Sequence, residues 1–152
     1  MKSLLIIVTL ISLTALCQED DRYTRTRNHM VRTQIEARGI SDPGTLRAMR
    51  TVPRHLFVPP SYSSEAYSDR PLPIGYSQTI SQPFIVAYMT QLARPAKGKI
   101  ALEIGTGSGY QAAVLAEIVD TVYTIEIVPE LARESAARLK ILGYGNIVAR
   151  YG

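Results

Sequence analysis

The spacing of apolar and polar residues divides this chain into a helical first part and a second part in which strands and helices alternate. In the first part, apolar positions recur at helical spacing, and we expect helices over residues 30–38, 44–50 and 83–92. In the second part, apolar runs predict strands at 100–104, 122–126 and 146–150, with helices at 110–119 and 130–142. The first strand is expected to be buried, because it is apolar at Ile100, Ala101, Leu102 and Ile104. This alternation is typical of an α/β fold with a parallel sheet.

Capping residues indicate where the early helices begin and end. The helix over 30–38 is expected to bury Val31 and Ile35 and to end at Gly39. Asp42 is a preferred N-cap residue, and Pro43 suits the first position of the next helix. Residues 52–60 contain too many prolines for a regular element, and residues 67–81 are expected to be irregular, with short strand-like pieces.

A glycine-rich turn follows the strand at 100–104 and indicates a ligand site. Glycines let backbone amides approach a ligand closely, and the helix that follows adds a partial positive charge. The sequence lacks the third glycine of a dinucleotide-binding loop, since Tyr110 occupies that position, and it lacks the Gly-Lys-Ser/Thr ending of a P-loop. Glu103, two residues before Gly105, disfavours a pyrophosphate. A ligand with a ribose and a cationic end but no phosphate fits better, and S-adenosylmethionine is such a ligand.

An acidic residue lies where it would contact the ribose of this ligand. Glu126 ends the strand at 122–126, 21 residues after Gly105, which is about the separation found in related folds. A carboxylate there accepts hydrogen bonds from both ribose hydroxyls. The alternative is that the glycines form an ordinary tight turn and that Glu126 is a solvated strand end.

Composition and charge exclude several other classes of protein. At 152 residues, with 46% apolar and 20% charged residues, the chain is expected to form one globular domain. The net charge of +4 comes from scattered basic residues, among them Arg27, Arg50 and Arg54, without any nucleic-acid-binding motif. We therefore expect no nucleic-acid partner. His29 and His55 are not spaced as metal ligands, and no metal is expected.

The first residues resemble a secretory signal peptide. Lys2 precedes an apolar run at residues 4–16, and Cys17 is followed by a polar segment. We expect a signal peptide over 1–17 that is removed after Cys17, and a flexible arm over 18–29. The apolar run is too short to span a membrane comfortably, so no stable membrane anchor is expected after cleavage. The sequence thus predicts an exported, periplasmic protein whose mature chain has no cysteine.

Two longer segments resemble the protein-L-isoaspartate (D-aspartate) O-methyltransferase family. They are Ala-Tyr-Ser-Asp-Arg-Pro-Leu-Pro-Ile-Gly-Tyr-Ser-Gln-Thr-Ile-Ser-Gln-Pro at 66–83 and Ala-Leu-Glu-Ile-Gly-Thr-Gly-Ser-Gly-Tyr-Gln at 101–111. Residues 30–40 and 52–59 are also similar to the family's opening segments, so the resemblance extends over about 30–152. Many methyltransferases share the glycine loop, whereas the stretch at 71–83 is much more specific to this family.

The resemblance implies a Rossmann-like methyltransferase fold and a role for each matching residue. Ser81 is the expected active-site residue, beside the substrate carboxylate and the methyl donor, and Gln78 and Thr79 are expected to line the substrate site. The expected cofactor-binding residues are Glu103, Gly105, Thr106, Gly107, Gly109 and Glu126. The substrates would be L-isoaspartyl and D-aspartyl residues in damaged proteins or peptides, which the enzyme methylates for repair. From spacing alone, Ser81 is equally suited to be the N-cap of the following helix.

The family also bears on the organisation of the chain. We expect an N-terminal helical and substrate-loop region at 30–95 and the first half of a cofactor-binding domain at 96–152. Three strands form only an incomplete doubly wound sheet, and one flank of the strand at 100–104 would lack a partner. The chain is thus expected to be a C-terminally truncated fragment, or to need a partner. Family members usually continue further, and their default location is the cytoplasm.

Other functions are compatible with parts of the sequence. A methyltransferase of the same fold could act on another acceptor, although the stretch at 71–83 argues against this. A non-catalytic cofactor-binding remnant is the alternative from a different class. An NAD-dependent oxidoreductase is disfavoured by Tyr110.

Overall fold

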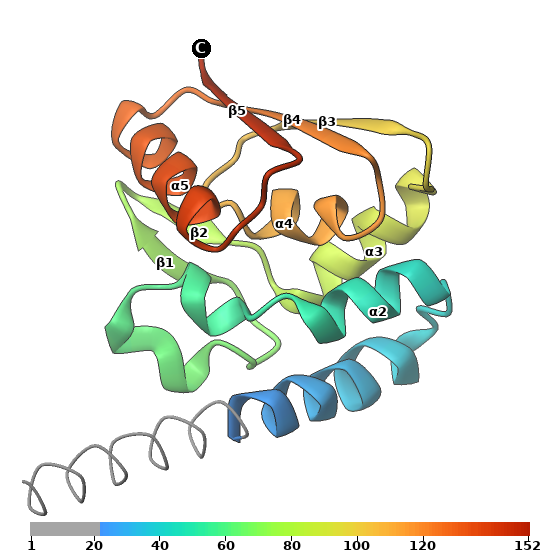
Figure 1. The fold of residues 1–152 in the computed structure, drawn as a ribbon. Helices are drawn as coiled ribbons and strands as arrows, with labels where there is room; N and C mark the ends of the chain where they lie inside the picture. The colour runs from blue at the N-terminus through green and yellow to red at the C-terminus, as the bar shows by residue number, and fades with distance from the viewer. Residues whose placement is uncertain (1–21) are drawn as a thin grey trace, which may run out of the picture.

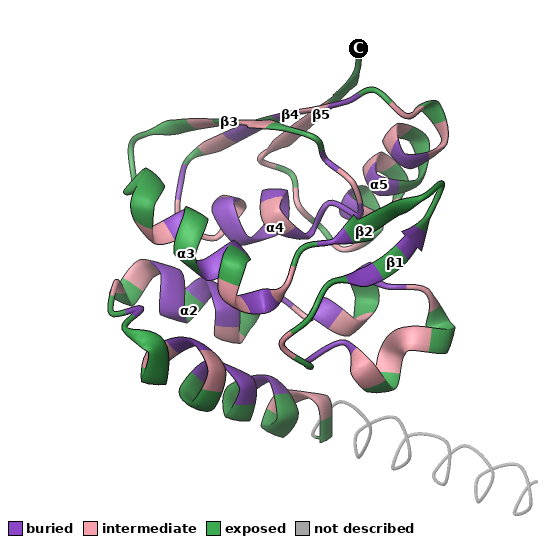
Figure 2. Cartoon of the chain, turned by 180° about the vertical axis from the view of Figure 1, so that it is seen from behind, coloured by how far each residue is buried: buried purple, intermediate pink, exposed green. Residues whose placement is uncertain are grey.

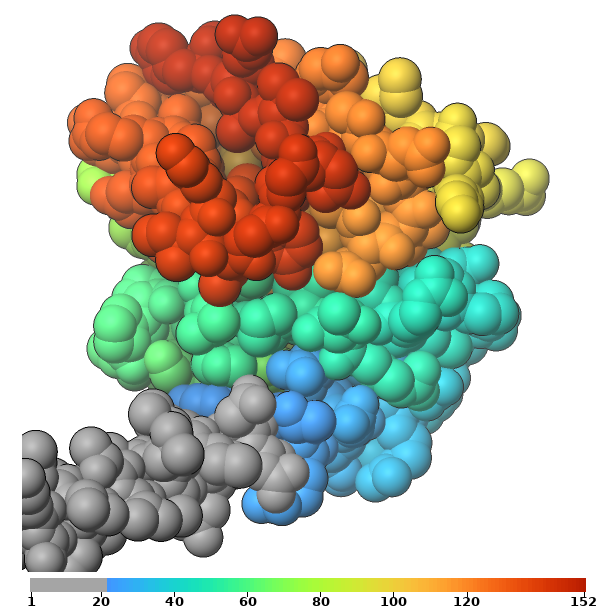
Figure 3. All heavy atoms as spheres, in the orientation of Figure 1, coloured from blue at the N-terminus to red at the C-terminus, as the bar shows by residue number. Residues whose placement is uncertain are grey.

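The computed structural model describes residues 22–152, which are arranged in three layers (Figure 1). A three-stranded sheet forms the first layer, helices α4 and α5 lie beneath it, and α2 lies with the N-terminal helical segment on the far side. The space-filling view shows the same stacking, from the earliest residues at one end to the sheet at the other (Figure 3). The expected signal peptide at 1–17 and the first four residues of the expected arm lie outside the described residues.

The N-terminal segment is helical, so the expectation of a flexible arm over 18–29 is wrong for its described part. Residues 22–30 form an α-helix, which continues as a π-helix at Val31–Ile35 and a 3-10 helix at Glu36–Arg38. The Tyr23 ring stacks on His55, with the ring centroids 3.8 Å apart, and the buried Arg27 donates a hydrogen bond to the carbonyl of Arg50. These contacts anchor residues that looked polar and unpatterned in the sequence.

The helix ends agree with the capping residues of the sequence. Gly39 ends the first segment with φ of +91°, a left-handed conformation that favours glycine. Helix α2 spans Pro43–Thr51, and the Asp42 carboxylate accepts a hydrogen bond from the amide of Thr45 at 2.7 Å. Helix α3 spans Pro83–Ala93, and packs against α2.

The segment between α2 and α3 contains short elements that carry the expected substrate residues. Two 3-10 helices, η3 at Arg54–Phe57 and η4 at Pro60–Glu65, replace the irregular proline-rich stretch. A hairpin follows, in which β1 (Leu72–Gly75) pairs with β2 (Gln78–Ile80) in antiparallel fashion. Its turn residues, Tyr76 and Ser77, have φ of +52° and +58°, a left-handed conformation that non-glycine residues seldom adopt.

The sheet confirms the predicted parallel α/β arrangement. Its strands are β3 (Ile100–Ile104), β4 (Thr121–Glu126) and β5 (Ile147–Tyr151), parallel and in the order β3-β4-β5. The connecting helices are α4 (Tyr110–Ala116), which ends three residues earlier than expected, and α5 (Pro129–Ile141).

The expectation that β3 is buried is wrong. Ile100, Leu102 and Ile104 are 69%, 65% and 70% exposed. The reason is that α4 and α5 lie on the opposite face of the sheet, and that β4 is the only strand paired with β3 among the described residues (Figures 1 and 2). The buried apolar residues of the sheet instead face α4, as Val122 does with Ala112 and Leu115.

Candidate functional site

The loop between β3 and α4 needs its glycines for backbone conformation. Gly105, Gly107 and Gly109 have φ of +91°, +53° and +89°, which residues with a Cβ rarely adopt. Gly109 is the N-cap of α4, and a Cβ there would lie 3.2 Å from Cγ of Leu139. The sequence-predicted turn is therefore confirmed, and Gly109 also allows the loop to pack closely against α5.

Glu126 lies against the glycine loop. It is only 6% exposed, and its Oε2 accepts a hydrogen bond from the Gly107 amide at 2.7 Å. Its Oε1 accepts one from the Val128 amide at 3.0 Å. Each carboxylate oxygen has a second lone pair. The carboxylate thus shapes the loop and retains acceptor capacity, although Glu126 lines neither of the two cavities described below.

Glu103 is connected to the glycine loop through the hydroxyls of Thr124 and Thr106. The hydroxyl of Thr124 donates to the Glu103 carboxylate and lies 2.6 Å from the hydroxyl of Thr106. Burial raises the pKa of Glu103 to about 7, the Thr124 hydrogen bond opposes this shift, and the nearby Glu126 adds to it. No basic residue forms an ion pair with Glu103 among residues 22–152. The site therefore contains a carboxyl group that would gain from a cationic ligand.

The end of β2 and the glycine loop form two neighbouring cavities. The inner one has a volume of about 60 Å³ and is lined by Thr79, Ile80, Ser81, Val86, Glu103, Gly105, Thr106, Gly107, Ser108, Tyr110 and Gln111. An adjoining groove of about 310 Å³ runs between α3, β3 and α4. Ser81, Glu103, Gly105 and Gln111 line both. Residues that are far apart in the sequence thus meet at one place.

The structure brings together most, but not all, of the predicted site residues. Ser81, Thr79, Glu103, Gly105, Thr106 and Gly107 line the inner cavity, whereas Gln78, Gly109 and Glu126 line neither cavity. The alternative role of Ser81 as an N-cap is wrong, because Gln82 is the N-cap of α3 and no side chain caps this helix. The sequence reasoning missed five residues of the inner cavity, which are Ile80, Val86, Ser108, Tyr110 and Gln111. The Gln111 amide donates to the Thr90 hydroxyl at 2.9 Å, which joins α4 to α3 behind the cavities.

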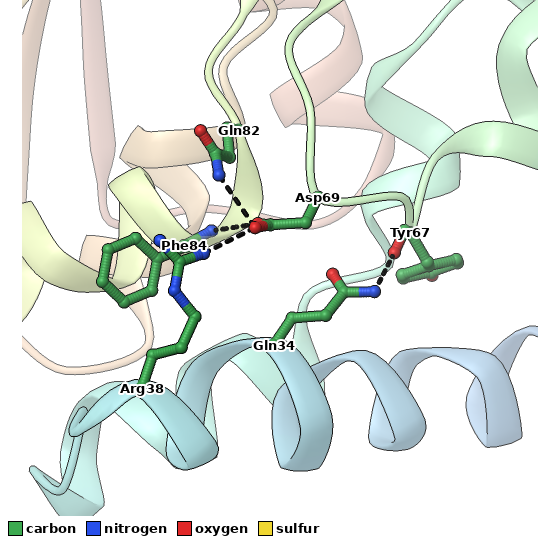
Figure 4. A network of polar contacts seen from close by, with 6 residues as sticks. All are labelled: Gln34, Arg38, Tyr67, Asp69, Gln82 and Phe84. Carbon is green, nitrogen blue, oxygen red and sulfur yellow. Dashed lines mark hydrogen bonds and ion pairs between the residues drawn. The ribbon is translucent and has the colours of Figure 1, made fainter.

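A polar network holds the chain directly after Ser81 (Figure 4). The Asp69 carboxylate accepts hydrogen bonds from Arg38 Nη1 at 2.6 Å, Gln82 Nε2 at 2.8 Å and the Phe84 amide at 3.3 Å. The Arg38 guanidinium also lies over the Phe84 ring, 3.5 Å from its centroid. One carboxylate thus ties the N-terminal helical segment to the start of α3.

The tip of the β1–β2 hairpin contacts helix α5. The Tyr76 hydroxyl donates to the Glu134 carboxylate at 2.7 Å, across 58 residues of sequence. Ile74 lies close to the glycine loop, since a Cβ on Gly107 would come within 3.4 Å of its Cδ1. The hairpin that leads to Thr79 and Ser81 is therefore fastened to α5 and to the loop.

Within 22–152 there is no group of three or more His, Cys, Asp or Glu side chains arranged to hold a metal ion. No helix in this range is long and apolar enough to cross a membrane.

Comparison with known proteins identifies the family. The sequence profile of the protein-L-isoaspartate (D-aspartate) O-methyltransferases matches residues 25–152. The protein-L-isoaspartate O-methyltransferase of Opitutus terrae is 60% identical over 129 residues, covering 85% of this chain and 55% of the relative. Protein-L-isoaspartate O-methyltransferase 2 of Shewanella sediminis is 51% identical over 157 residues, covering 99% of this chain and 64% of the relative.

The fold agrees with that family. A solved structure of a protein-L-isoaspartate O-methyltransferase matches with a TM-score of 0.70 and 26% identity, over 82% of this chain and 41% of that one. The chain spans between half and two thirds of the length of the curated relatives named above. On the profile match and the identity to these relatives, the chain belongs to the protein-L-isoaspartate (D-aspartate) O-methyltransferase family.

Proposed function

We propose that this protein transfers a methyl group from S-adenosylmethionine to the free carboxylate of L-isoaspartyl, and D-aspartyl, residues in damaged proteins. The observation that carries the proposal is the meeting of Ser81 with Glu103 and the glycine loop around one cavity. Ser81 comes from the segment most specific to the family, whereas Glu103 and the glycines come from the loop shared by many methyltransferases. A methyl donor and an acceptor would therefore lie next to each other.

The residues around the glycine loop fit S-adenosylmethionine. Around Gly105 the space is open, since a Cβ there would meet no atom within 4 Å, and a ligand can approach the backbone. Glu103 offers a carboxylate to the cationic end, and Glu126 offers acceptors to the ribose hydroxyls. When bound, S-adenosylmethionine supplies a methyl group activated by its sulfonium.

The acceptor needs orientation rather than activation. A carboxyl group has an ordinary pKa near 4, so the free carboxyl group of the isoaspartyl residue is already ionised near neutral pH and no general base is required. The exposed Ser81 hydroxyl can donate a hydrogen bond to that carboxylate and hold it in line with the methyl group. Such positioning can contribute roughly 7–11 kcal/mol to lowering the barrier. The amide nitrogen of the following residue then attacks the ester carbonyl, methanol leaves, and the resulting succinimide hydrolyses partly to normal aspartate.

Methyl transfer to matched peptides tests this function. An isoaspartyl peptide should be labelled by radioactive S-adenosylmethionine and should release methanol in base, whereas the peptide with normal aspartate should not. Ser81→Ala should lower kcat, while the control Ser64→Ala, which removes another exposed hydroxyl far from the cavity, should not. Equal labelling of the two peptides would overturn the proposed substrate.

We also propose that the protein is exported. The supporting observations are Lys2, the apolar run at 4–16 and the small residue Ala15 shortly before Cys17. N-terminal sequencing of protein from a bacterial host should begin near Gln18, and an intact Met1 on the purified protein would refute export.

A further inference from the structure

Arg54 is completely buried behind Ser81. Its side chain is 0% exposed, and its guanidinium donates two hydrogen bonds to backbone carbonyls. Nε donates to Ala66 at 2.7 Å, and Nη2 donates to Ser81 at 2.8 Å. A planar guanidinium presents these donors in a fixed fork, which a lysine ammonium does not. One side chain thus connects the chain before β1 with the residue that follows β2.

The charge of Arg54 is not neutralised by an ion pair within residues 22–152. Burial lowers the pKa of the guanidinium, and the nearby tyrosines Tyr110 and Tyr67 oppose this shift. The guanidinium lies over the Tyr110 ring, 4.8 Å from its centroid, and Nη1 has no hydrogen-bond partner. The Asp69 charge also favours the charged guanidinium but forms no ion pair with it, and burying a charge without a direct ion pair is costly. Arg54 therefore provides two hydrogen-bond donors in a fixed geometry rather than a gain in the stability of the folded state.

We propose that Arg54 is a positioning residue for methyl transfer, which fixes the backbone of Ser81 so that its hydroxyl faces the acceptor carboxylate. The proposal rests on the function proposed above. With its carbonyl held by Arg54, the Ser81 hydroxyl is limited to the staggered positions about a single side-chain torsion. Further along the chain, Asp69 holds the Gln82 side chain and the Phe84 amide (Figure 4). The backbone is therefore held at the Ser81 carbonyl and at the start of α3, and before the serine by the pairing of β2 with β1.

Arg54→Lys and a matched control test this role in the natural gene product. Arg27 is the control, because it is also a buried arginine that donates to a backbone carbonyl, but its partners are Arg50 in the last turn of α2 and the Tyr67 hydroxyl rather than Ser81. In Arg54→Lys, kcat for the isoaspartyl peptide should fall by about tenfold or more, since misplacement by about 1 Å can cost about 100-fold. The dissociation constant of S-adenosylmethionine should change by less than about threefold, because neither hydrogen bond reaches the glycine loop and a lysine ammonium keeps a cation near the Tyr110 ring. Arg27→Lys should lower the unfolding midpoint while kcat stays within about twofold of wild type.

A double-mutant cycle distinguishes positioning from general destabilisation. If Arg54 acts through Ser81, the double variant Ser81→Ala, Arg54→Lys should be no slower than Ser81→Ala alone. Independent, multiplicative losses would overturn the proposal. So would a folded Arg54→Lys variant whose kcat stays within about twofold of wild type, or a loss of kcat that Arg27→Lys shares.

A second measurement separates this proposal from the proposed function. A wild-type protein that methylates no isoaspartyl peptide would refute the function, and amide hydrogen exchange would then decide the role of Arg54. Residues 78–82 should exchange faster in Arg54→Lys than in wild type, but not in Arg27→Lys. Unchanged exchange in this segment would overturn the positioning role.

Discussion

The Glu126 carboxylate at the end of β4 accepts a hydrogen bond from the Gly107 amide, 2.7 Å away in the loop after β3. The acid expected to contact a ribose therefore also determines the shape of the loop that would lie beside the cofactor. Removing this side chain should affect ligand binding in two ways, by losing a direct acceptor and by releasing the loop.

We predict that Glu126→Ala lowers the affinity for S-adenosylmethionine more than Glu126→Gln does. The amide of Gln retains one acceptor oxygen, whereas Ala leaves the Gly107 and Val128 amides without partners. The loss in Ala should be about tenfold or more, since a hydrogen bond to a charged group contributes about 1.5–3 kcal/mol. Calorimetry measures it, with Glu130→Gln in the first turn of α5 as the control. Unchanged affinity in Glu126→Ala would show that the ligand binds elsewhere.

Gly109→Ala should destabilise the fold more than Gly143→Ala does. Gly109 and Gly143 have similar φ values, +89° and +83°. Placing a residue with a Cβ in this left-handed region costs about 1–2 kcal/mol, and this cost is the same at both positions. A Cβ at 109 would in addition press on Leu139 at 3.2 Å, whereas at 143 it would meet nothing within 4 Å. Urea unfolding compares the two. Adding Leu139→Ala should remove part of the difference, and equal effects of the two glycine variants would contradict the packing argument.

The raised pKa of Glu103 predicts a pH dependence of stability in the ligand-free protein. The folded state holds this proton up to about pH 7, whereas the unfolded chain releases it near the ordinary value of 4.5. The unfolded chain therefore binds fewer protons between these two values, and the free energy of unfolding should fall as the pH rises through them. Glu103→Gln should lack this part of the dependence when unfolding is measured at about pH 5 and about pH 8. Identical pH profiles would exclude Glu103 as the group responsible.

Binding of the cofactor should favour the ionised form of Glu103, whereas the ligand-free folded protein favours the protonated form. A cation beside Glu103 favours its ionised form, so binding below about pH 7 should release a proton from wild type but not from Glu103→Gln. Calorimetry in buffers with different ionisation enthalpies measures this release directly. Proton release of the same size in both proteins would mean that the cationic end lies away from Glu103.

The exposed face of β3 predicts the behaviour of residues 18–152 expressed on their own. Exposed apolar side chains beside an unpaired strand edge favour association between chains. We expect oligomers or poor solubility by size-exclusion chromatography, and improved solubility in Leu102→Lys. Leu56→Lys, at a position 44% exposed and outside the sheet, is the control. A monomeric and cooperatively unfolding 18–152 would contradict this prediction.

The sequence was sufficient where local chemistry decides the structure. The Asp42-Pro43 cap, the start of α3 at Pro83, and the strand, glycine loop and helix from Ile100 to Ala116 follow from residues close together in the chain. The same local signals placed Glu103 and the loop in the site. Ser81 needed the family resemblance, because its spacing fitted a cap equally well.

The remaining features depend on contacts between distant segments. Arg54 and Arg27 looked like ordinary scattered charges, and only the folded chain shows that both are buried. The segment before residue 30 shows no helical spacing of apolar residues, yet Tyr23 packs on His55, 32 positions later in the sequence. The exposure of β3 depends on what covers the sheet, which the strand's own residues do not determine.

The contact between Tyr76 and Glu134 has a consequence for the order in which this protein matures during synthesis. The hairpin leaves the ribosome 58 residues before the acid that fastens its tip. Domains fold as units while the chain emerges, so Ser81 reaches its final place only after β4 and α5 have been made. In a nascent chain, Ser81 would therefore remain unassembled until the glycine loop, β4 and α5 have been made.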